Sequence, residues 1–294
     1  MNSMFKDLDY FIAYRFLQDG NKNIPNERGS VHYHVIKSKI DEWYADPFPL
    51  EFCGHYYIFA ERMNKWRGRG SISFCEVYPD ETHSEFKEIL LEPFHLSYPN
   101  IFEYHNEIYM IPESGMNNDI RLYKATTFPY KWMIVDVIAE GHNYVDTSII
   151  KRENNNFLLV TFDWNNKIQS FINYNILTRE KTILPNNPKM MVERSGGNTI
   201  NNIRVLQDCK VDYGTKIIFR TIENDDFAHG NGQDTRLCEL TPSGITTDTQ
   251  LKPLRIHTFN RSSSLEVIDI LSCRKNILKQ AIRVYHHLPN FIKA

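Results

Sequence analysis

Hydrophobic and polar residues alternate along short stretches of the chain, and these stretches recur in pairs around tight turns. Residues 46–61 read as a strand, a turn at Gly54 and a second strand. A shift of 52 residues gives a similar pair at 98–113, and a further shift of 48 gives a third at 146–160. Short alternating stretches bounded by turn residues are typical of β-strands. The pattern therefore predicts a repeated β-unit of about 50 residues.

Two weaker units complete the series, at 194–208 and 257–269. Further β-like stretches lie between the pairs, so that each unit has room for about four strands: 71–78, 85–91, 120–125, 132–138, 168–176, 215–222 and 236–240. Repeated four-stranded units are the pattern of a β-propeller, whose blades surround a central channel. We therefore expect an all-β fold, a five-bladed β-propeller.

Both ends of the chain fall outside the five units. Residues 10–16 are β-like, and we expect them to close the last blade, because an open ring would leave an unpaired edge. Residues 274–287 carry apolar residues at helical spacing before Pro289, which predicts a short C-terminal helix. The expected organisation is a propeller at 1–272 and a helical tail at 273–294. The basic side of that helix has two interpretations, a solvated face, which general experience favours, or a peripheral contact with a membrane.

Composition and charge exclude several classes of function. The chain has 34 Lys and Arg against 36 Asp and Glu, a net charge of −2, which lacks the basic footprint of nucleic-acid binding. No apolar run reaches the roughly 18–20 residues of a transmembrane helix, and the N-terminus does not resemble a secretory signal, so we expect a cytoplasmic protein. The five cysteines lack metal-binding spacing. We therefore expect buried free thiols, no metal site and no cofactor.

The repeat brings candidate chemistry together. In a propeller the first residues of the units meet at one mouth of the channel, which unites Asp46, Tyr98, Asp146, the 193–197 turn and His257. Two carboxylates from non-adjacent blades suit glycoside chemistry, which uses carboxyl groups facing each other across the scissile bond. The alternative is that both aspartates only cap turns.

Two further segments add binding groups at this mouth. Residues 92–99 combine an imidazole, a hydroxyl and aromatic rings, so that His95 and Ser97 can hydrogen-bond a sugar while Phe94 or Tyr98 stacks on it. A polar loop packed for structure is the alternative. In the 193–197 turn, the double glycine allows a close backbone approach or a bulge, and Arg194 can bind a phosphate or carboxylate.

Several motifs resemble a known family: Ala-Asp-Pro-Phe at 45–48, His-Leu-Ser-Tyr-Pro at 95–99, Met-Ile-Pro-Glu-Ser at 110–114, Phe-Pro-Tyr-Lys-Trp at 128–132, Tyr-Val-Asp-Thr at 144–147, and Gln-Asp-Cys at 207–209 with Tyr-Gly at 213–214. Together they resemble the propeller domain at the N-terminus of plant glucosamine inositolphosphorylceramide transferases, and related bacterial proteins of surface-polysaccharide synthesis. The resemblance runs from about residue 10 to 270. More distantly, the chain resembles the five-bladed glycoside hydrolases of families 43, 32 and 68.

These resemblances imply a glycosyl or related transferase in surface-polysaccharide synthesis, with a sugar or glycan substrate and a nucleotide-activated sugar as a candidate donor. The glycosidase pattern implies Asp46 as base or nucleophile, Asp146 as its orienting partner, and Glu193 as acid. Glu113, which ends the second strand of its unit, is the other candidate acid, and a structural ion pair with a nearby arginine is its alternative role. The expected substrate-binding residues are His95, Ser97, Tyr98, Arg194, Gln207, Asp208 and His257. Two alternatives remain open: a glycoside hydrolase or phosphorylase, and a non-catalytic glycan-binding module that partners a transferase.

Overall fold

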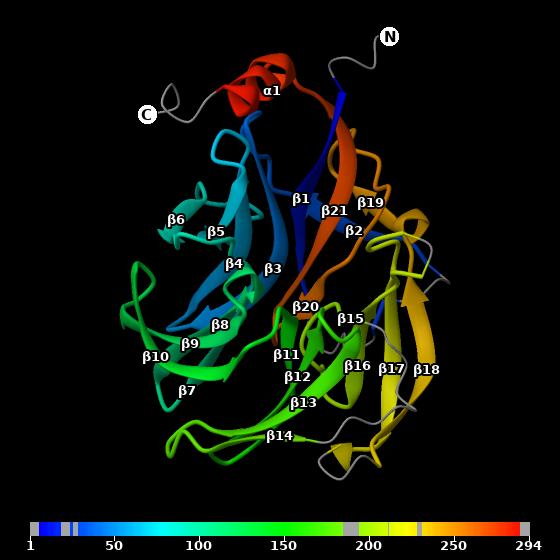
Figure 1. The fold of residues 1–294 in the computed structure, drawn as a ribbon. Coiled ribbons are helices and arrows are strands. Elements are labelled where there is room, and N and C mark those ends of the chain that lie inside the picture. Colours follow the sequence, from blue (N-terminus) through cyan, green and yellow to red (C-terminus); the bar gives the residue numbers. More distant parts are fainter. Residues whose placement is uncertain are drawn as a thin grey trace.

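The computed structural model describes residues 6–18, 24–25, 29–184, 194–210, 212–227 and 231–288. Within them, five β-sheets stand around a common axis and one short helix follows the last strand (Figure 1). The predicted five-bladed all-β propeller with a C-terminal helix is therefore confirmed.

Each blade comes from one sequence unit. Blade one contains β3 (Glu42–Phe52), β4 (His55–Asn64), β5 (Arg69–Val77) and β6 (Lys87–Leu90). Blade two contains β7 (Ser97–Tyr104), β8 (Glu107–Ser114), β9 (Asp119–Thr127) and β10 (Lys131–Glu140). Blade three contains β11 (Tyr144–Glu153), β12 (Asn156–Asp163), β13 (Ile168–Asn175) and β14 (Lys181–Leu184). Blade four contains β15 (Arg194–Ser195), β16 (Ile203–Gln207), β17 (Ile217–Asn224) and β18 (Gln233–Leu240).

Blade five draws strands from both ends of the chain. It contains β1 (Lys6–Phe16), β2 (Val31–Val35), β19 (Ile245–Thr247), β20 (Phe259–Arg261) and β21 (Leu265–Lys275), in the order β19-β2-β1-β21-β20. All 11 residues of β1 pair antiparallel with β21. Ile12 and Ala13 of β1 are completely buried. The N-terminal strand is thus an interior strand of the last blade, and it joins the two ends of the ring.

A β-bulge recurs at the start of the inner strand in the first three blades. Asp46, Tyr98 and Asp146 have φ angles of 52°, 44° and 53°, and the pairing register skips at each of them. A bulge re-aims the groups next to it. Here it directs three backbone N–H groups at carboxylates of the channel, as the contacts below show. The sequence repeat therefore marks a repeated backbone feature as well as repeated strands.

The C-terminal helix is shorter than the sequence predicts. Strand β21 continues to Lys275, and α1 spans Lys279–His287. Arg274 stays in the strand because its guanidinium bonds to the carbonyl oxygens of Ser38, Lys39 and Glu42. The expected boundary at 272/273 consequently falls inside β21. Within the described part of the chain, no helix has the length and hydrophobicity that a membrane span needs.

The cysteines are all free, but the expectation that they are buried is wrong for most of them. Only Cys75 is fully buried, whereas Cys53, Cys209 and Cys273 are exposed. Cys53 lies at the β3–β4 turn and Cys273 near the end of β21, where the backbone leaves the packed part of its blade.

Candidate functional site

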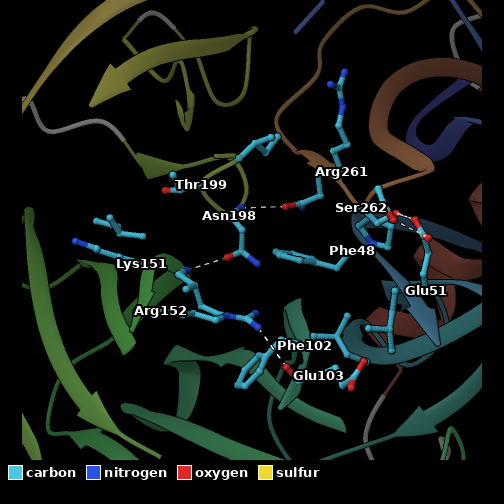
Figure 2. A pocket seen from close by; sticks show the side chains of 18 residues that line it. Phe48, Glu51, Phe102, Glu103, Lys151, Arg152, Asn198, Thr199, Arg261 and Ser262 are labelled. Carbon is cyan, nitrogen blue, oxygen red and sulfur yellow. Dashed lines mark hydrogen bonds between the residues drawn. The ribbon is translucent and has the colours of Figure 1, made fainter. Parts of the chain in front are cut away.

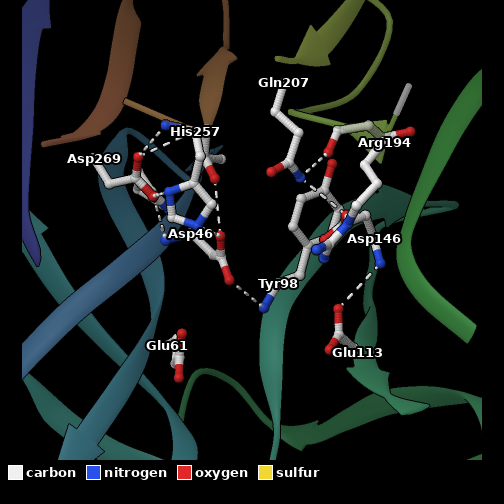
Figure 3. A network of polar contacts seen from close by, with 12 residues as sticks. Asp46, Glu61, Tyr98, Glu113, Asp146, Arg194, Gln207, His257 and Asp269 are labelled. Atoms are coloured by element: carbon white, nitrogen blue, oxygen red, sulfur yellow. Dashed lines mark hydrogen bonds and ion pairs between the residues drawn. The ribbon is translucent and has the colours of Figure 1, made fainter. Parts of the chain in front are cut away.

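A buried network of acidic and basic side chains lines one end of the channel, here called the funnel (Figure 3). It contains Asp46, Glu61, Glu113, Asp146, Asp269, Arg194, Gln207 and His257, with the backbone of Tyr98. The structure therefore brings the starts of the repeat units together in one place.

Asp46 is held by three donors. Its Oδ1 accepts a hydrogen bond from the Thr258 hydroxyl at 2.8 Å and lies 3.1 Å from His257 Nε2. Its Oδ2 accepts the backbone N–H of Tyr98 at 3.2 Å. Burial alone raises the pKa of Asp46, but the charge of His257 and these hydrogen bonds bring its pKa below the ordinary value. Asp46 is therefore ionised at neutral pH.

His257 lies between two carboxylates. Its Nε2 faces Asp46, and its Nδ1 is 2.8 Å from Asp269 Oδ2. Asp269 also accepts the backbone N–H groups of Asp46, His257 and Thr258, at 3.0 to 3.1 Å. Burial alone lowers the pKa of His257, but Asp269 and the other acidic groups around it hold the pKa well above the ordinary value. The ring is an imidazolium that ties the first and last blades together.

Asp46, His257 and Asp269 are also the residues best placed to hold a metal ion, because each offers a ligand atom within 4.8 Å of the others. A metal ligand must be a neutral imidazole with a free nitrogen lone pair. In this structure both nitrogens of His257 face carboxylates, and its Nδ1 forms no hydrogen bond. The group is an ion-pair triad here, and the same three side chains would suit a metal ion if His257 gave up its proton.

The other half of the network is built around Asp146. Its Oδ2 accepts hydrogen bonds from Arg194 Nε at 2.5 Å and Gln207 Nε2 at 3.0 Å. Its backbone N–H donates to Glu113 Oε2 at 3.1 Å. Burial and the charge of Asp146 raise the pKa of Glu113 to about 8. Burial and Asp46 also raise the pKa of Asp146, against the effect of Arg194. Glu113 is therefore protonated at neutral pH.

His95 pairs with the remaining acid of the funnel. Its Nδ1 accepts the backbone N–H of Gly70 at 2.9 Å, so a neutral His95 carries its proton on Nε2, 3.2 Å from Glu61 Oε1. A side chain at Gly70 would collide with the carbonyl oxygen of Leu96 and with Glu61. The missing Cβ is thus what lets His95 reach into the funnel.

Aromatic rings surround the mouth of the funnel. The Arg194 guanidinium lies 5.6 Å from the Trp164 ring centre and 5.2 Å from that of Tyr213. These two rings are 45% and 40% exposed. The ring of Tyr10 lies 4.7 Å from that of His257. Exposed aromatic faces beside hydrogen-bonding groups are the usual make-up of a sugar site.

Three predicted residues do not act as the sequence suggests. The ring of Tyr98 is fully buried and its hydroxyl bonds Ser148 at 2.6 Å, so it does not stack on a ligand and contributes its backbone N–H instead. Ser97 is likewise buried. Asp208 accepts the N–H of Lys210 at 3.0 Å and caps a turn outside the network. Glu193 lies outside the described residues.

The double glycine packs against blade five. A Cβ on Gly197 would overlap the carbonyl oxygen of Phe259, and the carbonyl of Gly196 accepts the N–H of Phe259 at 2.7 Å. The close approach expected from the sequence is therefore one between neighbouring blades. Gly214, with φ of 59°, leaves room in the same way for His257.

Sequence reasoning missed Asp269, Trp164 and Tyr10. Asp269 had a signal, because it ends the second strand of its unit just as Glu61 and Glu113 do in theirs. The sequence carried no such signal for Trp164 and Tyr10, since both lie outside the repeated segment.

A cavity of about 490 Å³ opens farther along the inner strands (Figure 2). Its walls come from residues 48–51, 101–103, 149–152, 198–200 and 260–263, beyond the funnel residues on the same strands. The side-chain amides of Asn100 and Asn198 exchange two hydrogen bonds, at 2.8 and 2.9 Å, between the two ends of the channel. None of the predicted site residues lines this cavity.

Comparison with known proteins gives one family. Residues 35–228 match the family described as glucosamine inositolphosphorylceramide transferase 1, N-terminal. The transferase of that name from Oryza sativa subsp. indica is 29% identical over 194 residues, covering 61% of this chain and 26% of the relative. The Arabidopsis thaliana protein is 28% identical over 194 residues, covering 61% of this chain and 25% of the relative. The chain thus spans about a quarter of the length of these relatives.

Among solved structures, the catalytic domain of a GH62 α-L-arabinofuranosidase from Coprinopsis cinerea is similar with a TM-score of 0.56, covering 91% of this chain and 98% of that one. At 11% sequence identity this is a likeness of fold. The family match, in contrast, covers more than half of the chain and includes Asp46, Glu113 and Asp146. The chain therefore belongs to the family of the N-terminal domain of glucosamine inositolphosphorylceramide transferase 1.

Proposed function

We propose that this protein is carbohydrate-active and transfers a glycosyl group in the synthesis of a surface glycan, with Asp46 as base or nucleophile and Glu113 as acid. One observation carries the proposal. Two carboxyl groups of the same buried network have pKa values displaced in opposite directions, below the ordinary value for Asp46 and to about 8 for Glu113. Carboxyl groups whose environments separate their pKa values in this way are suited to act as an acid and a base at neutral pH.

The reaction that this pair supports is a displacement at the anomeric carbon. Glu113 donates its proton to the oxygen that leaves the anomeric carbon, which departs as a hydroxyl group from a glycoside or as the protonated phosphate of a nucleotide-activated donor. Asp46 accepts the proton of the acceptor hydroxyl, whose oxygen forms the new bond to the anomeric carbon. Asp146 holds Arg194 and Gln207 in place beside the acid. Both carboxyl groups then recover their starting states by exchange with solvent.

The family supports the transfer part of the proposal, because the matched relatives are named as transferases of glucosamine to inositolphosphorylceramide. Their named activity belongs to proteins about four times as long as the matched segment. A nucleotide-activated sugar is the donor that fits a transferase of this kind, and a glycan or glycolipid is the acceptor.

The test uses a panel of 4-nitrophenyl glycosides and nucleotide sugars with sugar acceptors, followed by release of nitrophenol or nucleotide and by identification of the product. We expect turnover to a glycosylated acceptor. Asp46→Asn should lower kcat by about 10² or more, the usual scale for a general base. Glu113→Gln should slow substrates with poor leaving groups most, because nitrophenol needs little protonation. Asp234→Asn, at a partly buried acid paired with Arg204 and Arg220 in blade four, is the matched control and should keep its activity.

Other results reject the transferase. Hydrolysis alone identifies a glycosidase. Binding of sugars without turnover, equal in the wild type and in Asp46→Asn, identifies a glycan-binding module. Full turnover in both carboxyl variants removes the proposed acid and base.

A further inference from the structure

The last part of the chain has an unusual charge. No Asp or Glu occurs among residues 270–294, which contain Arg274, Lys275, Lys279, Arg283 and Lys293. This segment carries five positive charges, although the whole chain has a net charge of −2. The rest of the protein is therefore clearly acidic, and positive charge is concentrated in the last part of the sequence.

Helix α1 and the turn before it place an apolar stripe on the outer side. Ile277, in the turn just before α1, is 73% exposed, Val284 on α1 is 61% exposed, and Ala281 between them is also exposed. Their spacing of three residues puts Ala281 and Val284 on one side of α1, and Ile277 precedes Ala281 by four residues. The opposite side is packed, since Ile282 is buried and the Tyr285 ring contacts Trp66 edge to face at 5.5 Å. The exposed stripe has no partner within the described residues.

The acidic side chains near the helix already pair with other groups of the protein. Asp7 pairs with Lys65 at 3.0 Å and Lys279 at 3.3 Å, and Asp9 pairs with Lys65 and Arg274. Asp41, in the turn directly before β3, accepts the indole N–H of Trp66 at 3.2 Å. Lys275 and Arg283 beside the stripe have no acidic partner among the described residues. The patch therefore presents apolar side chains flanked by cations whose charge is not neutralised.

We propose that the outer face of α1 binds an anionic lipid surface. A helix that combines an exposed apolar stripe, flanking Lys and Arg, and no acids has the composition of an interfacial membrane helix. An anionic surface matches the flanking charge, whereas a neutral surface would use only the stripe.

Helix α1 contacts the β4–β5 turn of blade one. His286 Nε2 lies 2.6 Å from the carbonyl oxygen of Lys65, in the β4–β5 turn. That turn follows Glu61 of the funnel by only a few residues on β4. Membrane binding through α1 therefore turns the funnel end of blade one toward the lipid.

The test is co-sedimentation of the full chain with vesicles of phosphatidylcholine alone and with vesicles that also contain phosphatidylserine. We expect binding to the anionic vesicles that weakens as salt is added. Ile277→Glu and Val284→Glu should each abolish most of the binding. Arg283→Glu should weaken it by about tenfold or more, because it changes two charge units near an anionic surface. Leu177→Glu, which alters a 60% exposed leucine between β13 and β14 of blade three, is the control and should bind as the wild type does.

Several results overturn the proposal: no sedimentation with either vesicle, equal binding to neutral vesicles, or the same loss in Leu177→Glu. A dimer in analytical ultracentrifugation that Ile277→Glu converts to a monomer, without vesicle binding, also overturns it and identifies the stripe as a contact between copies of the chain.

Discussion

Replacing Glu113 by Gln should make the protein more stable, and increasingly so as the pH rises. The folded state raises the pKa of Glu113 from its ordinary 4.5 to about 8, mainly by burial and then by the charge of Asp146. An acid with a raised pKa binds its proton more tightly in the folded state. Its contribution to stability is therefore complete below pH 4.5 and is lost as the pH rises through 8.

The magnitude follows from the size of the shift. Each pKa unit corresponds to about 1.4 kcal/mol, so the carboxyl group costs the folded state about 3 kcal/mol at pH 7 and about 5 kcal/mol above pH 8. Glutamine imitates the protonated acid and cannot ionise, so Glu113→Gln should recover an amount of this order. Because Asp146 titrates in the same network, the loss in the wild type should extend over a wider pH range than that of a single group.

The assay is urea unfolding of wild type and Glu113→Gln at several pH values between 5 and 9. We expect the two free energies of unfolding to meet near pH 5 and to diverge steadily toward pH 9. Glu140→Gln, an exposed acid at the end of β10, should follow the wild type throughout. Parallel curves for wild type and Glu113→Gln would refute the raised pKa, and with it the reason for assigning Glu113 as the acid.

Two further predictions test the ring itself by urea unfolding. Ile12→Ala on β1 removes a completely buried side chain and should lower the free energy of unfolding by about 2–5 kcal/mol. Leu8→Ala on the same strand, where Leu8 is 58% exposed, should change it little. Equal effects would contradict an interior position for β1. Asn198→Ala leaves the backbone N–H of Ile149 and the side-chain amide of Asn100 without their Asn198 partner. It should therefore lower the free energy of unfolding by about 2 kcal/mol or more. An unchanged unfolding midpoint would show that these hydrogen bonds do not stabilise the channel.

The sequence was sufficient for the fold because the blades repeat the same local structure. Each unit begins with a strand followed by a tight turn, and the first three units also share a bulge, at Asp46, Tyr98 and Asp146. The helix boundary was harder to predict, since Arg274 belongs to the strand only through bonds to carbonyl oxygens of residues 38–42, which are remote in sequence.

The site was predictable at the level of the backbone and less so at the level of side chains. Register placed Asp46, Asp146 and His257 together, because equivalent positions in a ring converge. Register does not say which way a bulged residue points, and for this reason Tyr98 was expected on the surface although its ring packs edge to face on Phe48 in the core. The place of Asp269 at the end of the second strand of its unit was a signal, but its contacts with Asp46 and His257 join the first and last blades and do not follow from the sequence.

Charge balance explains why the proton belongs on Glu113. Among the described residues, the carboxyl groups of Asp46, Asp146 and Asp269 face two cations in the centre of the network, His257 and Arg194. An ionised Glu113 would add a further negative charge in this buried site, and burial makes such a charge costly. Retaining a proton on Glu113 avoids that cost, and the same proton is then available for transfer to a leaving group. The charge balance of the network therefore also keeps on Glu113 the proton that the proposed acid would donate.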